Sequence, residues 1–457
     1  MLAGVLVLNT TFASSAPAGA IGPISERFEL SEIVGTLMIS LFVMGYMFGP
    51  LLWGPLSEAY GRRPVFLIPF TFYTLTQVGN AFAPNTAALL IFRFLGGFFA
   101  AAPLTNAGAM LGDLWAPEDR GKALSFFALG PFAGPTVSPL ITGFMTVAGV
   151  HWRWVFGLLA FFAGACTIVV FFTVPETYEP RLSVFLAQKK RKETGDDRYY
   201  APIEHRNIPF TQRLRDILGK PFKILFSEPM LIAITIYQSV CWILACLYLL
   251  FDAYPIVFTK GHRLNAGLTG LMYLPVTIGA FIGCFLYIYY WNPRYMRHVA
   301  AFDPDPVPPE YRLEMAIWAT VPYAAAFLWF GWTSYPSISL WAPMSQGIVM
   351  GWAIVWLFLS QLNYIIDTYL VVAASALAAN TVIRSIFGAT FPLFANKMYT
   401  ALTPRWASTV LGLFALLCVP IPFVLMRFGP TLRAKSRYSP KEPIPPPAPP
   451  KRNDSKA

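Results

Sequence analysis

Residues 33–63 read IVGTLMISLFVMGYMFGPLLWGPLSEAYGRR. From Ile33 to Trp53 this stretch holds no charged residue. A run of about 20 apolar residues is long enough to cross the hydrocarbon core of a bilayer. The stretch then ends in an acid, Glu58, and a pair of arginines, Arg62 and Arg63. The pattern predicts a membrane-crossing helix whose charged end reaches the water.

The composition of the whole chain also indicates a lipid environment. The 457 residues are 56% hydrophobic and only 12% charged, about half the charged fraction of an ordinary soluble domain. A soluble fold of this length would need a larger charged surface. The formal net charge is +11. Its Lys and Arg residues lie between long apolar runs and not on one exposed face, which argues against binding of nucleic acid.

Apolar runs of membrane-crossing length recur along the chain, and about twelve can be placed. They cover residues 1–21, 33–53, 64–83, 87–111, 123–147, 154–174, 231–258, 268–291, 315–332, 338–359, 369–394 and 406–426. We therefore predict an all-α polytopic membrane protein. Its parts are an N-terminal half with a short first span (1–174), an inter-half loop (175–229), a C-terminal half (230–428) and a disordered tail (429–457).

Basic residues collect on one side of the predicted spans. If every run crosses, the inter-half loop and the turns after the second, fourth and eighth spans share that side with the C-terminal Arg433, Lys435 and Arg437. Cytoplasmic loops are enriched in Lys and Arg. The prediction is that both termini lie in the cytoplasm.

The sequence holds no pattern typical of an enzyme, a metal site or a bound cofactor. There is no GxxxxGK[ST] loop, HExxH or GxSxG, and the four histidines map to loops or span ends. The five cysteines lie in apolar runs without a CxxC pair. A six-plus-six arrangement around a basic loop instead suits a secondary transporter that works without direct use of ATP.

The segment GPLSEAYGRR, residues 54–63, resembles the G-x-L-x-[DE]-x-x-G-[RK]-[RK] signature of the major facilitator superfamily. The resemblance implies two six-helix halves around a central cavity. It also implies that Glu58 faces the N-terminal end of the eleventh span and that Arg62 pairs with Asp113. Ala59 departs from the basic residue often found there. The predicted cytoplasmic gate consists of Gly54, Glu58, Gly61, Arg62, Arg63 and Asp113. The alternative is a simple positive anchor beside an incidental acid.

The fifth span contains GPFAGP, residues 130–135, which resembles the g-x-x-x-G-P motif of drug/proton antiporters. Gly130 and Gly134 would permit close helix packing, and Pro135 would bend the span. Ser138 and Pro139 stand where two glycines often complete the motif. A generic kinked helix is the alternative.

Few ionisable side chains interrupt the spans, and each is a functional candidate because a charge in the membrane is costly. Arg93 matches the R-x-x-x-G element that the resemblance associates with proton coupling; the alternative is a residue that snorkels to the interface or only braces helices. Asp252 is a candidate for proton coupling or for a structural gate. Tyr248, Asn380 and Arg384 are candidates for the cavity wall.

Longer stretches are similar to the fungal twelve-span drug/proton antiporter family. They include PETYEPRLSVFLAQKKRKETGDDRYYAP after the sixth span, PPEYRLEMA before the ninth and AANTVIRSIFGATFPLFANKMY in the eleventh. The resemblance implies export of drugs, polyamines or secondary metabolites in exchange for protons at the plasma membrane, with a vacuolar or other internal membrane as the alternative location. Members usually carry a cytoplasmic N-terminal arm and a complete first span, so the expectation is either a truncated gene model or a short first helix. Nutrient uptake and a sensor without transport are the alternative functions.

Overall fold

The chain folds into long α-helices. A computed structural model describes residues 2–115, 117–196, 198–201, 204, 219, 222–244, 253–302, 307–369, 373–436 and 438, and no strand occurs among them. The first half comprises α1 (Leu2–Ser15), the 3₁₀ segment η1 (Ala16–Ala20), α2 (Ile21–Phe28), α3 (Glu32–Tyr60), α4 (Arg62–Ala81), α5 (Thr86–Leu114), α6 (Pro117–Val147) and α7 (Arg153–Thr173). The helix α8 (Glu179–Thr194) follows.

The second half has the same general pattern with more interruptions. It comprises α10 (Pro229–Leu244), the π-helix η2 (Pro255–Gly261), α12 (Ala266–Leu271), α13 (Leu274–Leu286), the π-helix η3 (Tyr287–Trp291), α14 (Asn292–Phe302), the 3₁₀ segment η4 (Pro309–Leu313), α15 (Glu314–Thr333), α16 (Trp341–Thr368), α17 (Ala373–Thr390), α18 (Pro392–Cys418) and α19 (Pro420–Lys435). Thr403, with φ 64°, interrupts α18 and separates the eleventh predicted span from the twelfth.

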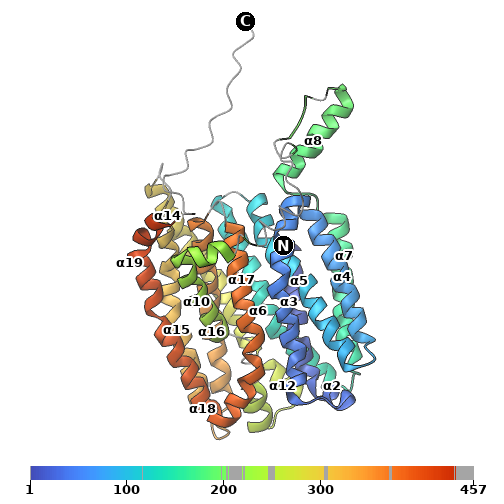
Figure 1. The fold of residues 1–457 in the computed structure, drawn as a ribbon. Helices are drawn as coiled ribbons and strands as arrows, with labels where there is room; N and C mark the ends of the chain where they lie inside the picture. The colour runs from blue at the N-terminus through green and yellow to red at the C-terminus, as the bar shows by residue number, and fades with distance from the viewer. Residues whose placement is uncertain are drawn as a thin grey trace.

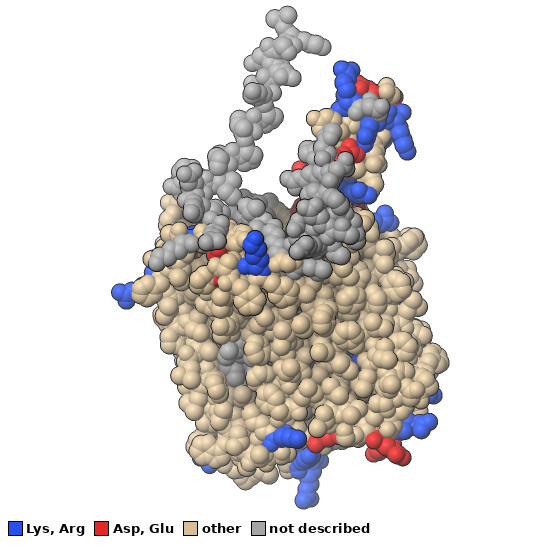
Figure 2. All heavy atoms as spheres, in the orientation of Figure 1, with Lys and Arg blue, Asp and Glu red and all other residues tan. Residues whose placement is uncertain are grey.

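The long helices run side by side between two ends of the bundle (Figure 1). We call the end with the turn at Gly61–Arg62 the Arg62 end; α8, α14 and α19 lie there. We call the other end, where α3 begins, the Glu32 end. Figure 2 shows that the wall between the two ends is almost free of charged side chains, which gather at the ends.

The apolar wall has the surface expected for a protein in lipid. Large apolar side chains point outward from it, among them Phe161, Phe172, Trp318 and Leu417, each more than 65% exposed. Among the described residues, nine helical segments are long and apolar enough to cross a membrane. In water such a surface would drive aggregation.

Three further helices, α4, α10 and α17, occupy the other predicted spans. The described part of α10 has 16 residues. The helices α4 and α17 contain more polar side chains, including Gln77, Asn80 and Asn380, and these are buried inside the bundle. The amide side chains of these two helices therefore face protein and not lipid.

Several boundaries differ from the sequence prediction. Helix α19 continues to Lys435, so residues 429–435 of the predicted disordered tail are helical. The first span continues past residue 21 to Phe28, because η1 joins α1 to α2, so it is longer than expected. The second span continues to Tyr60, which places most of the 54–63 motif on helix α3. The inter-half loop contains α8, which ends at Gly195 in the left-handed conformation that favours glycine.

Helix α6 joins the two halves by packing along α12 and α13. A Cβ atom on Gly270 of α12 would lie 2.4 Å from the carbonyl oxygen of Pro139, so only glycine fits there. The hydroxyls of Thr136 and Thr277 are hydrogen-bonded further along. Sγ of Cys284 lies 3.0 Å from the carbonyl oxygen of Ser125 towards the Arg62 end. The halves thus touch along most of this helix pair.

Candidate functional site

A tight turn joins α3 to α4 at the Arg62 end. Gly61 forms it with φ 96°, a conformation that residues with a side chain rarely adopt. A Cβ atom on Gly61 would also lie 2.2 Å from Oε2 of Glu176. Glycine is therefore required both by the backbone and by the neighbouring carboxylate.

The Arg62 side chain crosses from this turn to the end of α5. Its Nε donates a hydrogen bond to Oδ2 of Asp113 over 3.0 Å, and its Nη1 donates to Oγ of Ser57 over 2.6 Å. The ring of Tyr178 lies 5.0 Å from the guanidinium carbon. Only 7% of the Arg62 side chain and 27% of the Asp113 side chain are exposed. Removal of either charge would leave the other partly buried without this partner, which is destabilising.

A second carboxylate, Glu176, holds the first turn of α4. Its Oε1 accepts from the N–H of Arg62 over 2.7 Å, and its Oε2 accepts from the N–H of Arg63 over 3.2 Å. The first N–H groups of a helix have no partner within the helix and attract anions. Glu176 therefore caps α4 and ties the chain after α7 to the motif. We call Arg62, Asp113, Glu176 and Tyr178 the Arg62 clamp.

The other motif residues contribute in different ways. A Cβ atom on Gly54 would meet only Cγ2 of Thr105, at 3.7 Å, so no neighbouring helix approaches closely at Gly54. The Arg63 side chain is exposed and donates to the carbonyl oxygen of Phe171 over 3.1 Å. The side chain of Glu58 lies outside the described part of the structure.

Arg93 of α5 is fully buried and binds backbone on two other helices. Its Nε donates to the carbonyl oxygen of Met38 over 2.7 Å. Its Nη1 and Nη2 donate to the carbonyl oxygens of Ala13 and Ser14, each over 2.8 Å. The ring of Phe42 lies 4.3 Å from the guanidinium carbon. Arg93 thus joins α5 to α1 and α3.

The position of a proline explains why α1 needs this arginine. In an α-helix the carbonyl of Ala13 would accept from the N–H of residue 17, but residue 17 is proline and has no N–H. Helix α1 ends at Ser15, and the chain continues as 3₁₀ helix. Arg93 supplies the missing donor, and its positive charge suits the C-terminal end of a helix.

The fifth-span motif packs against α1. A Cβ atom on Gly134 would lie 2.2 Å from Oγ1 of Thr11, which leaves no room for a side chain. Oγ of Ser15 donates to the carbonyl oxygen of Pro135 over 3.2 Å. That carbonyl has no helical partner because Pro139 lacks an N–H. The Oγ hydroxyl of Ser15 therefore replaces the helical hydrogen bond that Pro139 removes.

We expect Gly134→Ala to lower the free energy of unfolding by about 1–3 kcal/mol, the usual effect of overpacking. The matched control is Gly130→Ala, since a Cβ there would lie 3.1 Å from its nearest neighbour, the carbonyl oxygen of Gly4, and needs only a small adjustment. Thermal unfolding of both variants in detergent would measure the difference. Equal losses would show that close packing does not explain this motif.

Two predicted cavity residues lie on α17 inside the bundle. Nδ2 of Asn380 lies 3.4 Å from Oγ1 of Thr235 on α10. The Arg384 guanidinium lies 5.7 Å from the ring of Phe358 on α16, and that ring contacts Phe132 of α6 at 5.6 Å. The pair Phe358 and Phe132 joins the two halves. Arg384 therefore lies close to the boundary between them.

The two remaining candidates lie outside the described residues. Tyr248 and Asp252 fall between the end of α10 at Leu244 and Ala253. Their assignment to the cavity and to proton coupling stays a prediction from the sequence.

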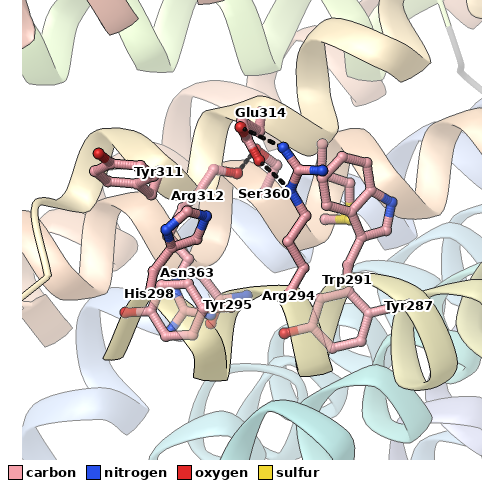
Figure 3. Close-up of a pocket in the computed structure, with 11 residues that line it drawn as sticks. Tyr287, Trp291, Arg294, Tyr295, His298, Tyr311, Arg312, Glu314, Ser360 and Asn363 are labelled. Atoms are coloured by element: carbon pink, nitrogen blue, oxygen red, sulfur yellow. Dashed lines mark hydrogen bonds and ion pairs between the residues drawn. The ribbon is translucent and has the colours of Figure 1, made fainter. Parts of the chain in front are cut away.

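A pocket lies at the Arg62 end of the second half (Figure 3). Its empty space, including the part open to solvent, is about 370 Å³. Its lining residues come from η3, α14, η4, α15 and α16: Tyr287, Trp291, Arg294, Tyr295, His298, Tyr311, Arg312, Glu314, Met315, Ser360 and Asn363. Arg294 and Glu314 face each other in Figure 3, joined by two hydrogen bonds of 2.9 and 3.0 Å.

A second clamp borders this pocket. Nε of Arg312 donates to Oδ2 of Asp367 over 2.8 Å, and the ring of Tyr295 lies 3.4 Å from its guanidinium carbon. Arg312 precedes the ninth span and Asp367 ends the tenth, as Arg62 precedes the third and Asp113 ends the fourth. The pairs are separated by 55 and 51 residues respectively.

Sequence reasoning missed this second clamp and also Glu176. The signal that could have revealed Arg312 and Asp367 is the repeated order of an arginine before one span and an acid at the end of the next. Glu176 had no such signal, because its role depends on the contact between the end of α7 and the turn at Gly61.

Comparison with known proteins agrees with this architecture. The chain matches the Major Facilitator Superfamily over residues 2–392. It is similar in fold to the proton:xylose symporter XylE bound to 6-bromo-6-deoxy-D-glucose (TM-score 0.66, 14% identity, 93% of this chain and 94% of that one). It is also similar to the human organic anion transporter MFSD10 (TM-score 0.62, 15% identity, 92% and 97%). At these identities the likeness concerns the fold alone.

Curated relatives are much closer in sequence. The efflux pump FUBT of Fusarium oxysporum is 39% identical over 96% of this chain and 73% of its own length. The multidrug transporter mdrA of Aspergillus fumigatus is 40% identical over 96% and 72%. The citrinin biosynthesis cluster transporter mrr1 of Monascus ruber is 39% identical over 95% and 87%. This multi-pass membrane protein therefore belongs to the Major Facilitator Superfamily, among relatives that are fungal efflux pumps and secondary-metabolite cluster transporters.

Proposed function

We propose that this protein exports small organic molecules across the plasma membrane in exchange for protons, by alternating access. The observation that carries the proposal is the Arg62 clamp, a charged contact at one end of a bundle whose halves meet along α6 and α12–α13. The names of the curated relatives, which include efflux pumps and a multidrug transporter, support export over uptake.

A gate must form in one state of the transport cycle and open in the other. The Arg62 clamp suits this task because its groups are polar and Asp113 is about a quarter exposed. Water can hydrate these polar groups when they separate, whereas separation of an apolar interface would expose unfavourable surface. Its residues come from the first half and from the start of the inter-half loop, so a change in the clamp would alter how that half is tied to the loop while the two halves rock around a central site.

The proposed orientation follows from charge. Arg62, Arg63 and the basic residues of α8 lie at the same end of the bundle. Cytoplasmic segments of membrane proteins are rich in such residues. We therefore assign the Arg62 end and both termini to the cytoplasm.

The proposed substrates are drugs, polyamines or fungal secondary metabolites. Asn380 and Arg384 are the proposed contacts in the second half, and Phe358 and Phe132 would form part of an aromatic wall between the halves. Flat organic molecules pack well against such rings.

Proton exchange can be tested with purified protein in sealed vesicles. The probes are a cationic dye, spermidine and citrinin, one from each proposed class. We expect an imposed pH gradient to accelerate the flux of at least one probe, and collapse of the gradient by a protonophore to remove the acceleration. Flux that ignores the gradient would refute proton coupling.

The direction of transport needs intact cells. Cells without the protein should accumulate more of the transported probe than cells that express it. Cells that instead fail to take up a nutrient would support the uptake alternative.

A further inference from the structure

The helix α8 has one covered face and one exposed face. Val184 and Ala187 are buried. On the same side, Nη2 of Arg191 pairs with Oε1 of Glu204 over 2.6 Å. The chain that follows α8 therefore folds back along this side of the helix.

The opposite face is apolar and lacks a cover among the described residues. Leu182, Phe185 and Leu186 are 39%, 48% and 61% exposed. Their spacing of three and four residues places them on one face, together with Lys189 one turn further on. Figure 1 shows that α8 stands away from the helix bundle, so the bundle does not cover this face.

The helix is also strongly basic. It contains five basic and two acidic residues over residues 179–194. Lys189 forms a 3.8 Å pair with Glu193, and the ammonium of Lys190 lies 5.4 Å from the ring of Tyr199. Lys189, Lys190 and Lys192 are all exposed at the outer part of the helix. Figure 2 shows blue side chains gathered around this arm. An apolar patch followed by lysines is typical of a helix that lies on an anionic lipid surface.

A lipid surface is within reach of this face. Helix α8 begins only five residues after α7 ends at Thr173, and Phe172 beside that end is 79% exposed on the apolar wall. The apolar patch occupies the first two turns of α8, the part nearest to the membrane. The 16-residue helix is about 24 Å long, so its lysines can also reach the headgroups if the helix tilts.

The chain between α7 and α8 belongs to the Arg62 clamp. Glu176 binds the N–H groups of Arg62 and Arg63, and Tyr178, directly before α8, covers the Arg62 guanidinium. A force on the start of α8 at Glu179 therefore acts one and three residues away, at Tyr178 and Glu176. This connection links the position of α8 to the state of the clamp.

We propose that the exposed face of α8, formed by Leu182, Phe185, Leu186, Lys189, Lys190 and Lys192, binds the anionic surface of the adjacent leaflet and thereby holds the Arg62 clamp closed. The lipid contact does not depend on the transported substrate. Its effect on flux, and the assignment of this leaflet to the cytoplasm, rest on the proposed function.

Hydrogen exchange of the full chain in lipid nanodiscs tests the contact directly. In discs of phosphatidylcholine with phosphatidylserine, we expect the amides of α8 to exchange roughly tenfold more slowly than in pure phosphatidylcholine, because a few lysines near an anionic surface supply an attraction of that size. High salt should remove the difference, since it screens the charges. Equal exchange in both kinds of disc would overturn the proposal.

Two variants and one control separate lipid binding from a loss of fold. The triple variant K189Q/K190Q/K192Q and the single variant Leu186→Gln should each lose the phosphatidylserine effect. Lys223→Gln removes an exposed lysine outside α8 and should keep it. Protection of α8 that appears only with added cytosolic protein, and in neutral discs alike, would assign the face to a protein partner and overturn the lipid contact.

Flux measurements then test the link to the clamp. In vesicles with phosphatidylserine, the triple variant should change the transport rate, whereas in neutral vesicles it should match the unaltered protein. A rate unchanged in both lipids, alongside a confirmed effect on exchange, would overturn the regulatory part. The exchange experiment needs no substrate, so a failure of the proposed export would not be mistaken for a failure of lipid binding.

Discussion

Arg93→Met should abolish transport and destabilise the protein by about 3 kcal/mol or more. The substitution removes the donors for three buried carbonyl oxygens, those of Met38, Ala13 and Ser14. The Ala13 carbonyl would be buried without a partner, which costs about 1–3 kcal/mol, and the Met38 and Ser14 carbonyls would each lose a hydrogen bond to a charged group, worth about 1.5–3 kcal/mol. Thermal unfolding in detergent and probe flux in vesicles would measure the two effects. Arg93→Lys should give an intermediate loss, because one ammonium cannot reach three carbonyls with the geometry of a guanidinium.

A second substitution tests why Arg93 is needed. Pro17→Ala restores an N–H that can bond the carbonyl of Ala13. We expect Pro17→Ala to recover part of the stability lost in Arg93→Met. If the loss is the same with proline or alanine at position 17, the capping of α1 is not the function of Arg93. A stable Arg93→Met variant that transports without responding to pH would instead support the role in proton coupling.

Arg62→Gln and Asp113→Asn should each reduce the transport rate about tenfold, the change that corresponds to roughly 1.4 kcal/mol. Each leaves a partly buried charge without its 3.0 Å partner. The adjacent Arg63→Gln is the matched control, because the Arg63 side chain is exposed and bonds only the carbonyl of Phe171 among its described partners. It should have little effect on rate.

The double variant decides whether Arg62 and Asp113 act as a pair. If they do, the loss in Arg62→Gln/Asp113→Asn should be smaller than the product of the single losses, with a coupling of about 0.5–3 kcal/mol. The charge-swapped variant Arg62→Asp/Asp113→Arg should regain part of the rate. Independent, multiplicative losses and no recovery on swapping would contradict a gate built on this pair.

The membrane-spanning character of the chain could be predicted from the sequence because a lipid environment places simple requirements on it. A span must be apolar over a fixed length, its backbone must be satisfied by helical bonds, and its charged ends must reach water. Residues 33–63 follow all three rules, and so they indicated both the helix and the position of its charged end. The match of the 54–63 segment to a known signature then indicated the family.

The hydrogen-bond partners of single side chains could not be predicted in the same way, because they depend on contacts between distant segments. Sequence identified Arg93 as an unusual charge, but a charge alone does not reveal that its partners are carbonyls of α1 and α3. The role of Pro17 likewise emerges only when Arg93 is seen beside Ala13. Glu176 lies 114 residues from Arg62, and nothing in the local pattern joins them.

Hydropathy, charge placement and motif spacing were thus sufficient for the all-helical membrane fold, the family and the residues worth attention. These signals act locally along the chain, because the requirement that a span be apolar comes from the surrounding lipid and not from a distant segment of the protein. The tertiary structure decided which carbonyl each buried donor satisfies, that Gly61 and not Gly54 has a close neighbour, and that a second clamp mirrors the first. These features required the packed helices, because a buried polar group takes whichever partner the neighbouring helix brings within hydrogen-bond distance.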